Sequence, residues 1–518
     1  MASYRLYIDW GNDGVWGAGD EVTADLLSWS AGRRFASRDA RAAQAGRATF
    51  VMNNPISAYT PIVNPAAEPM LRVRLTMTVG ATERPVFTGR IREFNPDPRW
   101  GYRICTLDCV DLTYMLQGNR IGIPVQVYVR ADQLIETAIT AAGHASTKSA
   151  LSERGIGQLQ ISADRWDYQW TEWFMRQQKS ETVAYDVVAQ AALSGWGRWF
   201  VDGAGEWRFY NRHHRAFGES PDYYLYDDPP AFSESMFMTA AKFRTSVETV
   251  KNELQVAYYP RTIGTTFEVL ARIAPGSPLS IDPGQTRNVV LSYRDPSGST
   301  SQIGAYSVTP VGPGGGLDAT YERTGDGPSA NGDVSVTGQY NATRANLFIT
   351  NNNLTQPIWI HRLEVRGVAV RMRESQRVTV FDLPSQTAYQ LRQLALSCSL
   401  ISQEYEARRL AEYLLNQLRF PQQEMDEIVL NADQGDDVAA LIRDLELLDT
   451  IGLTHARAGL AVTGVVAQLH HSMSAARGHR LTLALEPVPA YLDGSGAGIT
   501  NPFRIGSPIN NSAYDMVY

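Results

Sequence analysis

The sequence predicts a mainly β protein with α/β parts. Its 518 residues, enough for three to four domains, include 42 glycines, 24 tyrosines and 11 tryptophans, a composition typical of strands and turns. Short segments in most of the chain alternate apolar and polar residues, as half-buried strands do. Helical periodicity is confined to a few segments, of which 402–418 is the clearest.

Residues 1–118 are predicted to form the first β region. The segment at 4–10 runs into a turn cluster at 11–14, where Asp-Gly adopts positive φ at little cost. Strands this short and this closely spaced indicate a barrel or a sandwich. The predicted strands are 4–10, 71–77, 85–91 and 104–110.

Residues 119–240 are predicted to form an α+β domain. Apolar residues at helical spacing follow Asp132 and stop at Gly143, and a second helix spans about 181–194. A hairpin is expected at 198–210, with Asp-Gly-Ala-Gly as its turn.

The rest of the chain divides into three predicted parts. Residues 263–375 are rich in Gly, Ser, Thr, Asn and Pro and contain alternating stretches, so we expect an inserted β-sandwich. The flanking segments 241–262 and 376–490 contain strands, and the second also contains the helix 402–418. Residues 491–518 lack periodicity and are expected to form an extended C-terminal arm.

Charge and cysteine content argue against several classes of protein. A net charge of −7 and a pI of about 5.7 give no basic excess of the kind that a dedicated nucleic-acid binder needs. Cys105 and Cys109 lie on one face of a strand but too far apart to bridge, so no disulfide framework is expected. The amino terminus lacks signal-peptide features and no run of about 18 apolar residues occurs, which predicts folding in the cytoplasm and no membrane span.

The sequence carries no recognisable catalytic motif. A His-Glu-x-x-His helix, a Gly-x-Ser-x-Gly elbow, a phosphate-binding Gly-Lys loop and a Cys-x-x-Cys pair are all missing. The adjacent pairs His213 with His214 and His470 with His471 would point to opposite faces of a strand, so neither pair can chelate one metal ion. We therefore expect no enzymatic activity and no cofactor, with calcium as the one candidate.

One local pattern resembles a calcium-binding loop. Asp9, Asp13 and Asp20 occupy its first, fifth and twelfth positions and Gly14 its sixth, where oxygens and a sharp turn let the chain wrap a hard cation. Gly11, at the third position, supplies no side chain. Two interpretations remain open: a tight Asx-rich turn between strands, and a calcium site on these three aspartates that stiffens the turn.

An aromatic cluster comprises Trp166, Tyr168, Trp170 and Trp173. Alternation at the first three positions places their rings on one face of a strand. Large aromatic residues dominate protein cores and subunit interfaces, which is the first interpretation. The alternative is a sugar-binding platform formed by Trp166, Trp170 and Trp173.

Several segments together resemble the tail hub family of long-tailed phages and prophages, which comprises baseplate hubs and central tail-tip or minor tail proteins. Their order along residues 1–485 carries the resemblance, whereas the insertion at 263–375 and the arm after 490 depart from the family's pattern. The segments that carry it are 8–14 with 20–25, 46–54, 85–91, 199–209, 252–261 and 406–415 with Pro421 behind it.

The resemblance implies a specific architecture. Such hubs use two tube-like β-barrel domains per subunit, so that three copies present a pseudo-sixfold ring to a sixfold tail tube. The candidates here are residues 1–118, and 241–262 together with 376–490. The chain is then expected to be a homotrimer, assembled in the host cytoplasm and located at the virion tail tip, around a channel that DNA crosses without specific binding. Its expected partners are the tail tube or distal tail protein, the tape-measure protein, and tail fibres or tip proteins.

Other functions remain open at this point. A receptor- or carbohydrate-binding tail protein is favoured by the sandwich and by the tryptophan cluster. A tail-associated hydrolase of cell-wall glycan is disfavoured by the lack of a nucleophile or metal motif. A secreted β protein unrelated to phages is disfavoured by the missing signal peptide.

Overall fold

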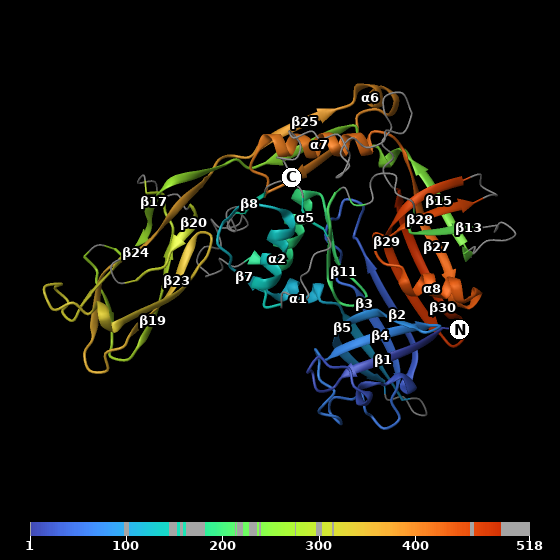
Figure 1. Ribbon diagram of the computed structural model, residues 1–518, viewed down its shortest axis with the longest axis horizontal. Helices are drawn as coiled ribbons and strands as arrows, with labels where there is room; N and C mark the ends of the chain where they lie inside the picture. The colour runs from blue at the N-terminus through green and yellow to red at the C-terminus, as the bar shows by residue number, and fades with distance from the viewer. Residues whose placement is uncertain are drawn as a thin grey trace.

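The fold is mainly β, as predicted, with strands arranged in seven sheets within the described residues (Figure 1). The computed structural model describes residues 2–97, 103–144, 153–155, 159–161, 182–212, 214, 221–226, 236–237, 240–274, 276–296, 303–312, 315–455 and 460–487.

Six strands form what we call the N-terminal unit, in the spatial order β1-β4-β5-β6-β3-β2. Buried and exposed residues alternate along them because only one face packs on a core. All four strands predicted here are confirmed, although β5 is about twice as long as predicted. Their bounds are β1 Ser3–Asp9, β2 Leu26–Arg34, β3 Arg47–Asn53, β4 Arg72–Val79, β5 Thr82–Asp97 and β6 Ile104–Val110.

Six later strands form the C-terminal unit, in the spatial order β13-β28-β29-β30-β27-β15. Numbered by their order in the chain, the strands of both units are arranged 1-4-5-6-3-2, so the second unit repeats the topology of the first. One pairing differs in direction, because β13 is parallel to β28 whereas β1 is antiparallel to β4. The bounds are β13 Tyr223–Tyr226, β15 Ala240–Ser246, β27 Gln422–Asn431, β28 Thr450–His455, β29 Leu460–Ser474 and β30 Gly478–Pro487, with the short β14 Met236–Phe237 beside β13.

The two units also correspond in register. Both contain one long strand, β5 or β29, and in both a β-bulge interrupts its pairing with the following strand. Just after the bulge, a row of paired apolar residues crosses three strands in each unit: Phe94, Leu107 and Phe50 in the first, and Leu469, Leu483 and Ile428 in the second. Equivalent positions can therefore be assigned residue by residue.

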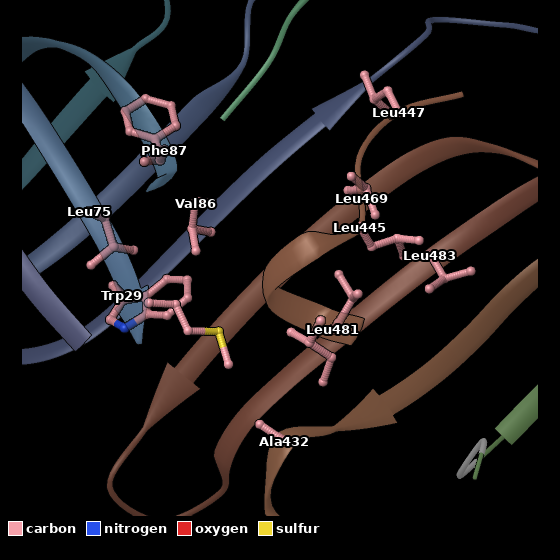
Figure 2. Close-up of a cluster of buried hydrophobic side chains, with 14 of the residues drawn as sticks. Trp29, Leu75, Val86, Phe87, Ala432, Leu445, Leu447, Leu469, Leu481 and Leu483 are labelled. Carbon is pink, nitrogen blue, oxygen red and sulfur yellow. The ribbon is translucent and has the colours of Figure 1, made fainter. Parts of the chain in front are cut away.

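The units join into one 13-stranded sheet through β2 and β29, which pair antiparallel from Ser28–Ser474 to Arg34–Gln468. Helix α8 (Asp436–Asp444) packs against β4, β5 and β27, so residues of both units share one hydrophobic core. Figure 2 shows side chains of this shared core, with Trp29, Leu75 and Phe87 contributed by the N-terminal unit and several leucines by the C-terminal unit.

A second core lies between the units and the sandwich. Helix α7 buries Ala407, Leu410 and Leu414 against β16 and β25, in one cluster with α2 and α5. This corrects the prediction that helix 402–418 and the strand near 253–258 belong to the second tube-like domain. The elements are α1 Thr113–Gly118, β7 Arg120–Ile121, β8 Gln126–Val129, α2 Ala131–Ala141, β9 Leu159–Ile161, β10 Thr182–Val183, α5 Ala184–Gly195, β11 Arg198–Val201, β12 Trp207–Tyr210, β16 Glu253–Tyr258, β25 Gln376–Phe381, α6 Leu383–Tyr389, β26 Gln393–Ser397 and α7 Glu404–Leu418.

Two further sheets enclose a third core and form the inserted sandwich. One contains β17, β18, β20, β21 and β24, and the other contains β19, β22 and β23. The sandwich projects away from the two units (Figure 1). Its strands are β17 Arg261–Arg272, β18 Leu279–Ile281, β19 Thr286–Ser292, β20 Gly304–Thr309, β21 Leu317–Thr320, β22 Val334–Tyr340, β23 Arg344–Asn351 and β24 Ile358–Met372.

The three cysteines, Cys105, Cys109 and Cys398, are buried free thiols, in agreement with the prediction that they form no disulfide framework. In the part of the chain that the structure describes, no helix combines the length and the apolar character that a membrane span requires.

Candidate assembly surface

The β2–β29 seam between the two units has a buried face and a polar face, because successive residues of a strand point to opposite sides. Trp29, Ala31 and Arg33 lie on the buried face of β2. Ser28, Ser30, Gly32 and Arg34 lie on the other, opposite Ser474, Ser472, His470 and Gln468 of β29. The seam is therefore the place where one polar surface continues from unit to unit.

An uncharged aromatic cluster closes the buried side of the seam. The Tyr4 hydroxyl lies 2.8 Å from Nδ1 of His479, whose Nε2 lies 3.2 Å from Nδ1 of His471. The ring of Trp29 contacts that of His479 in a tilted arrangement, with centroids 5.0 Å apart. Burial lowers the pKa of His479 to about 3 and lowers that of His471 well below its usual value, so both rings are neutral at pH 7.

Glu446 links three parts of the molecule. Its Oε2 accepts a hydrogen bond from Nη1 of Arg33 at 2.7 Å and another from the backbone N–H of Gly203 at 2.9 Å. Arg33 belongs to the N-terminal unit, Glu446 to the C-terminal unit, and Gly203 to the turn of the β11–β12 hairpin. A Cβ at Gly203 would lie 2.6 Å from the carbonyl oxygen of Pro85, so glycine alone fits this close approach.

Small polar residues dominate the polar face. One row of paired residues crosses five strands from β6 to β30: Asp108, Thr49, Ser30, Ser472 and Arg480. A groove on the same face is lined by Arg34, Arg47 and Arg92, together with Gln468 and His470. This surface is hydrophilic and carries more cationic than anionic side chains.

The predicted calcium loop forms a hydrogen-bonded turn. Asp9 is buried and accepts hydrogen bonds from the backbone N–H groups of Asp13 and Gly14, at 3.1 and 2.8 Å. Asp20 accepts from the N–H of Gly17 at 2.7 Å, and Asp13 from that of Val15 at 2.8 Å. The described residues contain no group of three or more His, Cys, Asp or Glu side chains arranged to hold a metal ion, so the structure does not bring these aspartates together as a ligand set.

The predicted sugar platform of Trp166, Trp170 and Trp173 lies outside the described residues, so it stays a prediction. His470 and His471 point to opposite faces, the first exposed and the second buried, as the strand geometry predicted.

An arginine-rich cavity escaped the sequence analysis because its lining comes from separate segments. It lies where the loop after β2, the β11–β12 hairpin, α7 and β30 meet. The guanidinium of Arg41 lies 3.6 Å above the ring of Trp196, and burial followed by the nearby Arg198 lowers the pKa of Arg41 to about 9. Arg198 forms an ion pair with Glu486. The four arginines of the cavity are Arg38, Arg41, Arg198 and Arg212.

Comparisons with known proteins give structural likeness without sequence likeness. No family model matches the chain. No curated protein matches it in sequence. Among solved structures, a tail protein from Neisseria meningitidis matches with a TM-score of 0.48 and 9% identity, covering 93% of this chain and 96% of that one.

Two other solved structures are of the same kind. A 43 kDa tail protein of prophage MuSo2 from Shewanella oneidensis matches at TM-score 0.46 and 10% identity, over 94% of this chain and 99% of that one. Prophage tail protein gp18 from Listeria monocytogenes matches with a TM-score of 0.40 and 8% identity, covering 93% of this chain and 94% of that one. All three structures are named as tail proteins, and the second and third are named as prophage proteins.

Proposed function

We propose that this chain is the hub at the tip of a phage or prophage tail, a structural protein that forms a ring around the exit channel for DNA. The observation that supports this proposal most strongly is the internal repeat. Two units of identical strand order, joined edge to edge in one sheet, are the arrangement expected of a protein that adapts a threefold tip to a sixfold tube. Three copies would supply six such units.

The polar face of the sheet would line the channel. Its serines and threonines are short and neutral, so they leave room for a duplex and offer it only weak contacts. The arginines of the groove would contact phosphates, and phosphate contacts carry no sequence information. DNA would therefore pass without specific binding, and the opposite face would remain covered by α8.

The inserted sandwich would anchor tip proteins or fibres. It has its own core and projects away from the units, so a partner can dock on it without blocking the ring (Figure 1). The tail tube or distal tail protein would bind one rim of the ring, and the tape-measure protein would end inside it. The receptor- or carbohydrate-binding role is the alternative for the same sandwich.

Antibody labelling of isolated tails tests the proposal. Antibodies raised against the full chain should decorate one end of each tail, the end distal to the capsid, in electron micrographs. Labelling along the whole tube, labelling at the capsid end, or absence of the protein from purified tails would overturn the proposed location.

A further inference from the structure

The internal repeat implies a second contact, equivalent to the β2–β29 pairing, that the described strands of a single chain do not form. Within a chain, β2 at the edge of the N-terminal unit pairs with the later half of β29 in the C-terminal unit. The strand equivalent to β2 is β15, and the strand equivalent to β29 is β5. Among the described strands, β15 pairs with β27 alone, and the later part of β5 pairs with β6 alone.

We propose that β15 of one copy pairs antiparallel with residues 93–97 of β5 in the next copy, repeating the β2–β29 seam between subunits. The occupant of each open edge is thus a second copy of this chain. This rests on the proposed ring and names the surfaces that would close it. A contact of this type joins different surfaces head to tail, so it generates a ring when its rotation closes.

The register of the proposed contact follows from the repeat. Ser30 pairs with Thr49 one residue before the apolar row of β3, and Lys242 pairs with Glu427 one residue before the equivalent row of β27. Lys242 is therefore equivalent to Ser30. By the same alignment, Asp97 lies three residues beyond Phe94, as Ser472 does beyond Leu469.

Because Ser30 pairs with Ser472 at the seam, Lys242 would face Asp97 of the neighbouring copy. Two residues further along, Arg244 would face Asn95, and after two more Ser246 would face Glu93. One strand thus carries two cations and the other two anions on the same polar face, whereas the seam within the chain carries serines at the equivalent first position. Opposite charges at facing positions of neighbouring strands stabilise a pair, and like charges oppose it.

Both edges are accessible in the single chain. The Lys242 side chain is 71% exposed and that of Glu93 is 51% exposed. Charged residues at an open edge prevent indiscriminate strand pairing. Pairing with any other strand would bury these charges beside like charges or without an opposite charge. Pro96 lacks an N–H and thus limits the number of backbone hydrogen bonds, so the charges would decide which edge is accepted.

A charge exchange in the full chain tests the contact, with ring formation on tails measured as the fraction of tails carrying the protein. Lys242→Glu alone and Asp97→Lys alone should each reduce incorporation about tenfold or more, because like charges would face each other between copies. Lys242 also forms an ion pair with Glu427 of its own chain, so Lys242→Glu adds a like-charge contact within the chain. The double variant should restore incorporation. Arg377→Glu, at an exposed position of β25 outside both units and the sandwich, is the matched control and should incorporate normally.

Cysteine cross-linking of the same tails fixes the register. Arg244→Cys with Asn95→Cys should give disulfide-linked trimers under oxidising conditions, whereas Ser30→Cys with Ser472→Cys should link only within one chain. Failure of rescue by the double variant, together with no link between copies at 244 and 95, would overturn this contact. If the protein is nevertheless present at the tail tip in three copies, the proposed function stands and only the assigned interface is wrong.

Discussion

Arg33 and Glu446 form an ion pair between the two units, with Nη1 and Oε2 2.7 Å apart and the arginine side chain only 7% exposed. Arg33 lies on the buried face of the seam, and the same Glu446 carboxylate accepts a hydrogen bond from the backbone N–H of Gly203. The two units are thereby fixed to each other and to the β11–β12 hairpin. A rigid relation between the units is what a ring of repeated units requires.

Glu446→Gln should lower the free energy of unfolding by about 2 kcal/mol, because it removes the carboxylate that forms the ion pair with the buried guanidinium of Arg33. This loss is smaller than that for breaking a fully buried ion pair, because the Glu446 side chain is 25% exposed. Urea denaturation followed by tryptophan fluorescence measures it. Glu404→Gln, in the exposed pair with Arg408, should cost less than about 0.5 kcal/mol, and equal losses for both variants would contradict the assigned role.

Acid should weaken the seam. The pKa of His479 is about 3 in the folded chain and 6.5 for a free histidine, so the unfolded state binds more protons between these values. The stability that neutral His479 contributes is therefore fully present above pH 6.5, and it falls as the pH drops toward 3. Buried Asp111, whose pKa is raised from 3.8 to about 6, acts in the opposite direction, so a variant must isolate the histidine.

The comparison of His479→Gln with the natural chain provides that isolation. The fall in Tm between pH 7 and pH 4 should be smaller in the variant, because its side chain does not titrate. His361→Gln in the sandwich serves as the control. An identical pH dependence of Tm in all three chains would show that the buried cluster does not govern acid stability.

Gly203→Ala should destabilise the docking of the hairpin by about 1 to 3 kcal/mol. The new methyl would press on the carbonyl oxygen of Pro85 and displace the N–H that Glu446 binds. Thermal unfolding measures the loss. Gly118→Ala is the matched control, because a Cβ there meets nothing within 4 Å; a comparable loss in Tm for Gly118→Ala would argue against close packing as the cause.

The turn at Asp9 should owe its stability to hydrogen bonds. Asp9→Ala removes the acceptor of two backbone N–H groups and should cost about 1 to 3 kcal/mol. The cost should be the same in millimolar calcium and in a chelator, and the Tm of the natural chain should not respond to either. A rise of Tm with calcium that Asp9→Ala and Asp20→Ala abolish would instead establish the calcium loop.

Local patterns predicted the elements well. The hairpin at 198–210 appears as β11 and β12, and helix 402–418 appears as Glu404–Leu418. Alternation identified the strand at 85–91 but not its full length, because the bulge after Ile91 and the residues Asn95 and Pro96 interrupt the pattern. The amphipathic pattern of α7 predicts that one face of the helix is buried, but it does not predict which sheet packs against that face. Its placement against β16 could therefore be learned only from the structure.

The candidate assembly surface was harder to predict from the sequence. The repeat conserves strand order and burial but not residue type, as the equivalent buried positions Phe50 and Ile428 illustrate. The β2–β29 seam joins segments more than four hundred residues apart in the chain, and no periodicity encodes such a pairing. The lining of the arginine-rich cavity comes from separate segments, so no local pattern could predict it either.

Imaging of the assembled protein at the tail tip by electron cryomicroscopy tests the central claim most directly. The account predicts three copies in a ring of six similar β units, with Ser30 and Ser472 facing a central opening. A ring in which only one unit of each copy reaches the opening, or a closed tip in which the β2–β29 face packs against other protein, would contradict it.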